Sequence, residues 1–63
     1  MTEREIEVLR RVAAGNANKS VAQLLNVSEE TIKAHMKSIL SKLGANDRTH
    51  AVTIALKRGI IEI

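Results

Sequence analysis

The chain has 63 residues, a formal net charge of +3 and a sequence pI of about 9.8. It contains no cysteine, proline or aromatic Phe, Trp or Tyr, which excludes disulfides and thiolate metal sites and requires an aliphatic core. No apolar run approaches the roughly 18 residues that a membrane-spanning helix needs, and no signal-peptide pattern is present. We therefore expect a cytoplasmic protein with a single domain over residues 1–63.

The positive charge is compatible with nucleic acid or with an acidic partner. Single-stranded nucleic acids and RNA are usually bound by stacking their bases on aromatic side chains. Because this chain has no aromatic rings of that kind, double-stranded DNA is favoured among the nucleic acids.

A first helix is predicted over residues 3–14. Thr2 and Glu5 have the spacing of a capping box, in which each side chain accepts a hydrogen bond from the backbone of the other residue. Gly15 follows as a residue that commonly ends a helix. The positions predicted to face inward are Ile6, Val8, Leu9, Val12 and Ala13.

A second, short helix is predicted over residues 19–25, with Asn18 as its N-cap. Its apolar positions are Val21, Leu24 and Leu25. Only two residues then separate it from Ser28, which is typical of an N-cap and opens a longer helix over residues 29–43. A short helix, a tight turn and a longer helix form the helix-turn-helix arrangement, in which the second helix enters the major groove of DNA.

The longer helix has two different faces. One apolar stripe is predicted to be buried, and a neighbouring face carries Lys33, Ala34 and Lys37. Like charges four residues apart repel each other slightly, whereas an external polyanion would bind both lysines, and the small Ala34 leaves room for close approach. The buried stripe consists of Ile32, Met36, Ile39, Leu40 and Leu43.

A fourth helix is predicted over residues 48–58, with Asp47 as its N-cap and Gly59 after its end. Its inward stripe is formed by Ala51, Val52 and Ala55. Ile54 lies off that stripe, which makes this helix a candidate contact between two copies of the domain. The residues expected to take part in pairing are Thr49, Thr53, Ile54 and Lys57.

Four motifs resemble the LuxR/NarL-type (GerE-type) helix-turn-helix domain in order and spacing. They are T-E-R-E-I-E-V-L from Thr2, N-K-S-V-A-Q-L-L from Asn18, V-S-E-E-T-I-K-A-H-M from Val27, and K-L-G-A-N-D-R-T-H-A-V from Lys42. The resemblance implies an all-α, four-helix domain that binds DNA, usually at the C-terminus of a transcription regulator with a receiver or ligand-binding domain upstream. We expect either an excised effector domain or a small stand-alone member.

The resemblance also assigns roles to residues. It implies base contacts from Lys33, Ala34 and Lys37, and it places the pairing of a homodimer on DNA at the fourth helix. Glu30 departs from the family pattern, in which this position is often basic or small, and its carboxylate either accepts from a cytosine amino group or repels phosphate. Ser20 also departs, since many members have Glu there. The candidate phosphate contacts are Asn18, Lys19, Ser28, Thr31, His35 and Arg48; for Arg48, a role in the loop before the last helix stays open.

Several alternatives remain at this stage. No nucleophile–base pair or glycine-rich phosphate loop indicates an enzyme or a cofactor, and His35 and His50 lack the neighbouring ligands that a metal site needs. The first three helices also resemble the promoter-reading region of a sigma factor, although the fourth helix argues against it. A helical protein-interaction module without DNA affinity is the other alternative. RNA polymerase is a further candidate partner of a transcription regulator.

Overall fold

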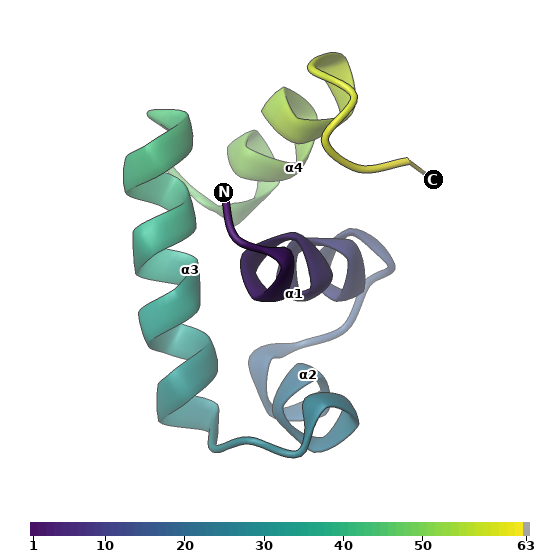
Figure 1. Ribbon diagram of the computed structural model, residues 1–63, viewed down its shortest axis with the longest axis vertical. Helices are drawn as coiled ribbons and strands as arrows, with labels where there is room; N and C mark the ends of the chain where they lie inside the picture. Colours follow the sequence, from purple (N-terminus) through teal and green to yellow (C-terminus); the bar gives the residue numbers. More distant parts are fainter. Residues whose placement is uncertain (63) are drawn as a thin grey trace.

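The structure, a computed structural model, describes residues 1–62 and contains four helices in that range and no strand. α3 stands along one side of the molecule, and α4, α1 and α2 lie beside it with α1 in the middle (Figure 1). The all-α prediction is therefore confirmed, and the predicted ends differ from the observed ones by at most one residue. The helices are α1 (Glu3–Ala13), α2 (Asn18–Leu25), α3 (Glu29–Leu43) and α4 (Arg48–Lys57).

Three of the helices begin at an N-cap residue whose side chain accepts a hydrogen bond from a backbone N–H of the first turn. In α1, Thr2 Oγ1 accepts from the Glu5 backbone N–H at 3.1 Å and Glu5 Oε1 accepts from the Thr2 backbone N–H at 2.9 Å, so the predicted capping box is present. Ser28 caps α3 by accepting from the Thr31 backbone N–H, and Asp47 caps α4 by accepting from the His50 backbone N–H. At its other end α3 stops at Gly44, whose φ of +65° is a left-handed conformation that glycine adopts without strain.

The start of α2 differs from the prediction. Asn18 is the first helical residue, and the N-cap is Ala17, which has no side-chain oxygen to accept a hydrogen bond. Asn18 Oδ1 instead accepts from Arg48 Nη1 at 3.1 Å. The N-cap assignment of Asn18 was therefore wrong, because a long-range contact uses the oxygen that a cap would need.

The core is entirely aliphatic and is built from all four helices and the segment after α4. Leu24, one of the apolar positions of the predicted second helix, is 54% exposed, whereas Ala22 is buried. At about 100° per residue, Val21, Ala22 and Leu25 share one face of α2, and Leu24 falls beyond its edge. The buried apolar residues are Val8, Leu9, Val12, Val21, Ala22, Ile32, Met36, Ile39, Leu43, Ala51, Ala55 and Ile61.

One charged residue, Glu5, is buried with this core in the described part of the chain, and it joins α1 to α3. Its carboxylate accepts from Ser38 Oγ at 2.8 Å and from Lys42 Nζ at 2.8 and 3.0 Å. The Lys42 ammonium, together with the Thr2 backbone N–H and the Ser38 hydroxyl, lowers the pKa of Glu5 from 4.5 to about 2. The carboxylate therefore stays ionised at neutral pH and fixes the second half of α3 against the first turn of α1.

Within residues 1–62, none of the helices has the length and apolar character needed to cross a membrane.

Candidate nucleic-acid interface

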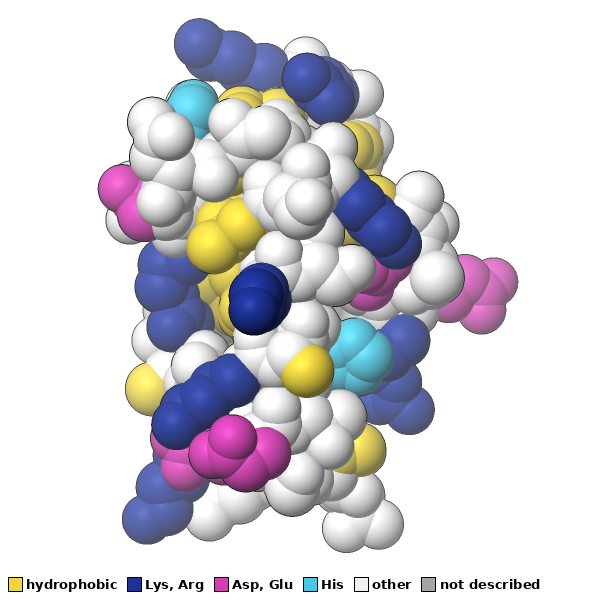
Figure 2. Space-filling view, turned by 90° about the vertical axis from the view of Figure 1, so that its left-hand side faces the viewer, with side chains coloured by type: hydrophobic (Ala, Val, Ile, Leu, Met, Phe, Trp, Pro, Cys, Tyr) yellow, Lys and Arg dark blue, Asp and Glu magenta, His cyan; other side chains and the backbone are white. Residues whose placement is uncertain are grey.

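The outer side of α3 presents a basic strip. Lys33, Ala34 and Lys37 are all exposed, and they lie together because residues three and four apart are neighbours on a helix surface. Figure 2 faces this side of the molecule and shows several Lys and Arg side chains spread over it, with acidic side chains among them. Three of the residues predicted to contact bases are thus brought together on an open surface, and Glu30 lies one turn before Lys33.

An ion pair modifies the charge at the start of this strip. Lys33 Nζ lies 3.4 Å from Glu30 Oε1, and the two side chains are 56% and 83% exposed. Such an exposed pair contributes only a few tenths of a kcal/mol, so Lys33 remains available to another ligand. Within residues 1–62, no salt bridge engages Lys37. Glu30 lies one helical turn before Lys33 and partly balances its charge.

Among the predicted phosphate contacts near α3, Thr31 and His35 lie along one edge of that strip, and Ser28 precedes the helix as its N-cap. Ser28 Oγ accepts from the Thr31 backbone N–H at 3.1 Å and lies 2.9 Å from Thr31 Oγ1. Ser28 is exposed, while Thr31 and His35 are half-buried. The Ser28 oxygen is used by its own helix, so its first role is to hold the start of α3.

Two of the remaining three predicted phosphate contacts, Asn18 and Arg48, are joined to each other. Arg48 Nη1 donates to Asn18 Oδ1 at 3.1 Å, and Arg48 Nη2 donates to the Asn16 backbone oxygen at 3.2 Å. Beside them, Lys19 is exposed in the first turn of α2. The structure therefore brings the start of α4 to the start of α2, which sequence spacing alone could not show.

The two helices of the predicted helix-turn-helix unit are joined as expected. α2 ends at Asn26, a residue in the left-handed conformation (φ 57°) that makes the turn into α3 sharp.

Comparison with known proteins agrees with this arrangement: the sequence model of the family described as bacterial regulatory proteins, luxR family, matches residues 1–55. The chain belongs to the luxR family. Its function is that of a DNA-binding domain in transcription regulation.

Individual relatives support the assignment. The chain is 51% identical over its whole length to the transcriptional regulatory protein YdfI of Bacillus subtilis, covering 30% of that protein. It is 41% identical over 58 residues to the nitrate/nitrite response regulator protein NarP of Escherichia coli, covering 92% of this chain and 27% of the relative. The solved structure of the transcription factor GerE superposes with a TM-score of 0.94 at 27% identity, covering 98% of this chain and 92% of that one. The luxR-family chain thus spans less than a third of the length of the curated relatives it matches.

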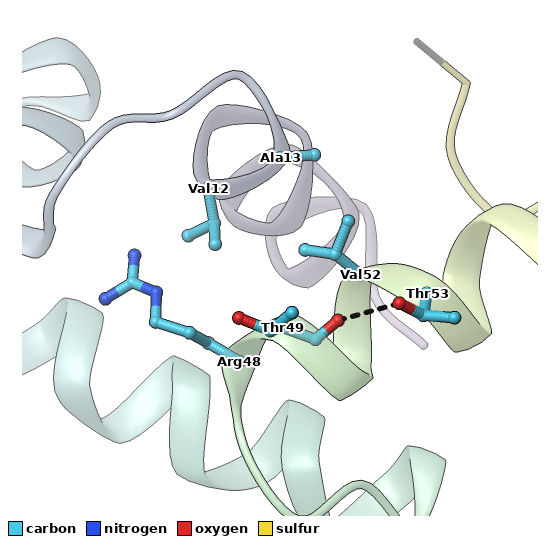
Figure 3. Close-up of a pocket in the computed structure, with 6 residues that line it drawn as sticks. All are labelled: Val12, Ala13, Arg48, Thr49, Val52 and Thr53. Atoms are coloured by element: carbon cyan, nitrogen blue, oxygen red, sulfur yellow. Dashed lines mark hydrogen bonds between the residues drawn. The ribbon is translucent and has the colours of Figure 1, made fainter.

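The luxR-family chain has a second surface on α4. A groove of about 280 Å³ lies between α1 and α4, as Figure 3 shows, and Thr53 Oγ1 donates to the Thr49 backbone oxygen at 3.1 Å along its edge. Thr49, Thr53 and Lys57 are exposed, as expected for a pairing surface. Ile54, by contrast, is half-buried and packs against the core. The groove is lined by Val12, Ala13, Arg48, Thr49, Val52 and Thr53.

Sequence reasoning missed the apolar residue that α4 does expose. Leu56 is 36% exposed and lies three residues after Thr53, so it shares the face of Thr49 and Thr53. Its spacing was a usable signal, because residues 49, 53 and 56 fall on one side of a helix. Leu56 therefore replaces Ile54 as the apolar candidate for pairing.

His50 lies on the surface at the start of α4. Its Nδ1 accepts from the Asn46 backbone N–H at 3.1 Å, and its own backbone N–H donates to Asp47 Oδ1 at 2.8 Å, so the ring helps to hold the start of α4. No group of three or more His, Cys, Asp or Glu side chains that could hold a metal ion occurs in the described range.

Proposed function

We propose that this luxR-family domain binds double-stranded DNA sequence-specifically with α3 in the major groove. The observation that carries the proposal is the exposed strip of Lys33, Ala34 and Lys37 on a helix whose first turn is capped and whose opposite face is buried. α2 and the Asn26 turn precede α3 in the order that major-groove readers use. Because the apolar face of α3 packs in the aliphatic core, the helix is held in place and the strip faces outward.

The side chains of the strip match the chemistry of base edges. A lysine ammonium donates to the O6 and N7 acceptors of guanine, and Lys33 and Lys37 are spaced one turn apart to reach successive base pairs. Ala34 between them is small enough to contact a thymine methyl group. Glu30 is an acceptor, so it suits the amino group of cytosine, and its ion pair with Lys33 would exchange for these contacts.

Contacts to the DNA backbone would come from around the strip. Phosphate contacts position a protein on the duplex without reading sequence. Lys19 supplies a free cation at the start of α2, and Thr31 and His35 lie beside the base-reading residues on α3. Ser28 and Asn18 serve as neutral partners of the phosphates, and Arg48 takes part through the start of α2.

Two domains would pair on adjacent half-sites through α4. One recognition helix reads few base pairs, so a homodimer on DNA multiplies the discrimination. The exposed face of Thr49, Thr53, Leu56 and Lys57 supports this surface. It is small compared with the roughly 1,000 Å² of a stable interface, so pairing is expected on DNA and not in dilute solution.

The relatives suggest how the domain is controlled. The names of NarP and of VraR of Staphylococcus aureus describe them as response regulators, and the chain covers only 27% and 30% of those proteins. We infer that an upstream receiver domain regulates this domain in the cytoplasm, and that RNA polymerase is its partner at promoters.

A salt titration of binding to a random-sequence duplex tests the proposed function. The logarithm of the binding constant falls with the logarithm of salt concentration by about 0.9 for each phosphate neutralised. Lys19, Lys33 and Lys37 are the exposed cations assigned to DNA, so a slope of about −3 is expected for one domain. Lys37→Gln should reduce the magnitude of the slope by about 0.9.

The matched control removes an equal charge elsewhere. Arg10 is exposed on α1 and lines a surface hollow with Glu3 and Glu7, so Arg10→Gln should leave the slope unchanged. A slope near zero for the wild-type chain would favour a protein-interaction module and overturn the proposed function.

A further inference from the structure

Arg48 connects two helices that do not pack against each other. α2 and α4 lie on opposite sides of α1 and share no packed surface (Figure 1). Yet the guanidinium of Arg48, at the first position of α4, donates to the side chain of Asn18 at 3.1 Å and to the backbone of Asn16 at 3.2 Å. In Figure 3 the guanidinium points away from Thr49, toward the loop between α1 and α2. Arg48 is half-buried, so this contact is partly shielded from water.

The chemistry of this contact fixes the orientation of the Asn18 amide. A guanidinium only donates hydrogen bonds, so the Asn18 side chain must turn its oxygen toward Arg48. Its NH₂ group then points the other way. Within residues 1–62, that NH₂ group makes no hydrogen bond to the protein, and Asn18 is only half-buried. A rotatable amide thus becomes a donor with one defined direction.

We propose that Arg48 is a positioning residue for DNA binding that acts through Asn18. It holds the start of α2 and turns the Asn18 NH₂ group outward to donate to a phosphate oxygen, while its own guanidinium stays committed to Asn18 and Asn16. This inference rests on the proposed function. It separates Arg48 from Lys19, which neutralises a phosphate directly.

Two readouts distinguish positioning from direct contact. A direct cation–phosphate contact survives replacement by lysine, because lysine binds phosphate as a point charge, and its loss lowers the salt slope by about 0.9. A positioning role needs the fork of two donors, so lysine cannot replace arginine. It also leaves the salt slope unchanged when the charge is removed, because the guanidinium then neutralises no phosphate.

The experiment measures affinity for a fluorescent random-sequence duplex by anisotropy, with the wild-type chain, Arg48→Lys, Asn18→Ala and the double variant. Each single variant should weaken binding by about three- to tenfold, the range expected for losing one or two polar contacts. The double variant should bind about as weakly as Asn18→Ala alone. In a further variant, Arg48→Gln, the salt slope should equal that of the wild type.

Val52→Ala serves as the control for stability. Val52 is half-buried on α4 beside the groove, so its truncation should lower the melting temperature without weakening binding well below that temperature. A loss of affinity in Val52→Ala equal to that in Arg48→Lys would assign the Arg48 effect to stability and overturn the inference.

Other outcomes overturn it separately from the proposed function. If the losses of Arg48→Lys and Asn18→Ala multiply in the double variant, Arg48 does not act through Asn18. Wild-type affinity in Arg48→Lys, together with a slope reduced by about 0.9 in Arg48→Gln, would show direct phosphate contact. In either case the wild-type chain still binds DNA, and only the role of Arg48 is refuted. A wild-type chain without salt-dependent binding refutes both.

Discussion

Glu5 gives the domain an acid-sensitive tie between α1 and α3, and replacing it should change how stability depends on pH. Glu5 is 4% exposed, and its carboxylate receives hydrogen bonds from Thr2, Ser38 and Lys42. These donors lower its pKa from 4.5 to about 2. Because the folded pKa is the lower one, the stabilisation is complete above pH 4.5 or so and is lost as the pH falls toward 2.

The magnitude follows from the pKa difference and from exposure. At about 1.4 kcal/mol per pKa unit, the change from 4.5 to about 2 sets an upper limit of about 3.5 kcal/mol. The Lys42 side chain is 46% exposed, so solvent screening reduces the contribution to roughly 1–2 kcal/mol. A domain of this size has only about 3–5 kcal/mol in total. Glu5→Gln should therefore remove a large share of its stability at pH 7.

Urea unfolding followed by far-UV circular dichroism measures the effect. Between pH 7 and pH 2 the wild-type free energy of unfolding should fall toward that of Glu5→Gln, mostly below pH 4.5, and the two curves should approach each other as the carboxylate becomes protonated. Glu7→Gln is the control, because Glu7 forms an exposed pair with Arg11 at 3.2 Å and should cost at most about 0.5 kcal/mol. A difference between wild type and Glu5→Gln that stays constant across this pH range would refute the reasoning.

Three further tests by substitution address the core, the basic strip on α3 and the pairing surface on α4. Ile39 is fully buried, so Ile39→Ala should destabilise the domain by about 2–5 kcal/mol in thermal melts, and near-wild-type melting would contradict its burial. Lys33→Ala should cost about 1–3 kcal/mol at one base position of a selected site, whereas Lys19→Ala should weaken all duplexes equally; identical sequence profiles would refute the division of roles. Leu56→Glu should leave binding to one half-site intact and abolish cooperativity on paired half-sites, and retained cooperativity would exclude this face of α4.

The local structure of the chain could be predicted because its signals are short-range. Ser28, Asp47 and Gly44 each act within a few residues. α3 begins after Ser28 and ends at Gly44, and α4 begins after Asp47. The α3 stripe follows from the helical period alone, and Ile32 and Ile39 are fully buried as expected. The helical period also predicts that the strip of Lys33, Ala34 and Lys37 faces outward, since a helix that buries one face exposes the other.

The polar contacts between helices could not be predicted in the same way. Glu5 meets Ser38 and Lys42, and Arg48 meets Asn18, across separations of 30 to 37 residues. Helical period shows which face a residue occupies but not which residue it meets. One signal was present, because Glu5 lies three, four and seven residues before the inward positions Val8, Leu9 and Val12. A carboxylate on that stripe must find partners when it is buried.

These polar contacts decide which cations remain for DNA. α3 carries three lysines, but Lys42 binds the buried carboxylate of Glu5 and is not free to neutralise a phosphate. Lys33 is held only by an exposed pair with Glu30, and Lys37 by no salt bridge in the part of the chain that the structure describes. The lysines of α3 therefore have two different roles that depend on where they lie along the helix. Its last turn is anchored to α1 through Lys42, and the turns before it keep Lys33 and Lys37 for the groove. Because the anchor acts far from the strip, Glu5→Gln should disturb the seating of α3 without removing any group that reads a base.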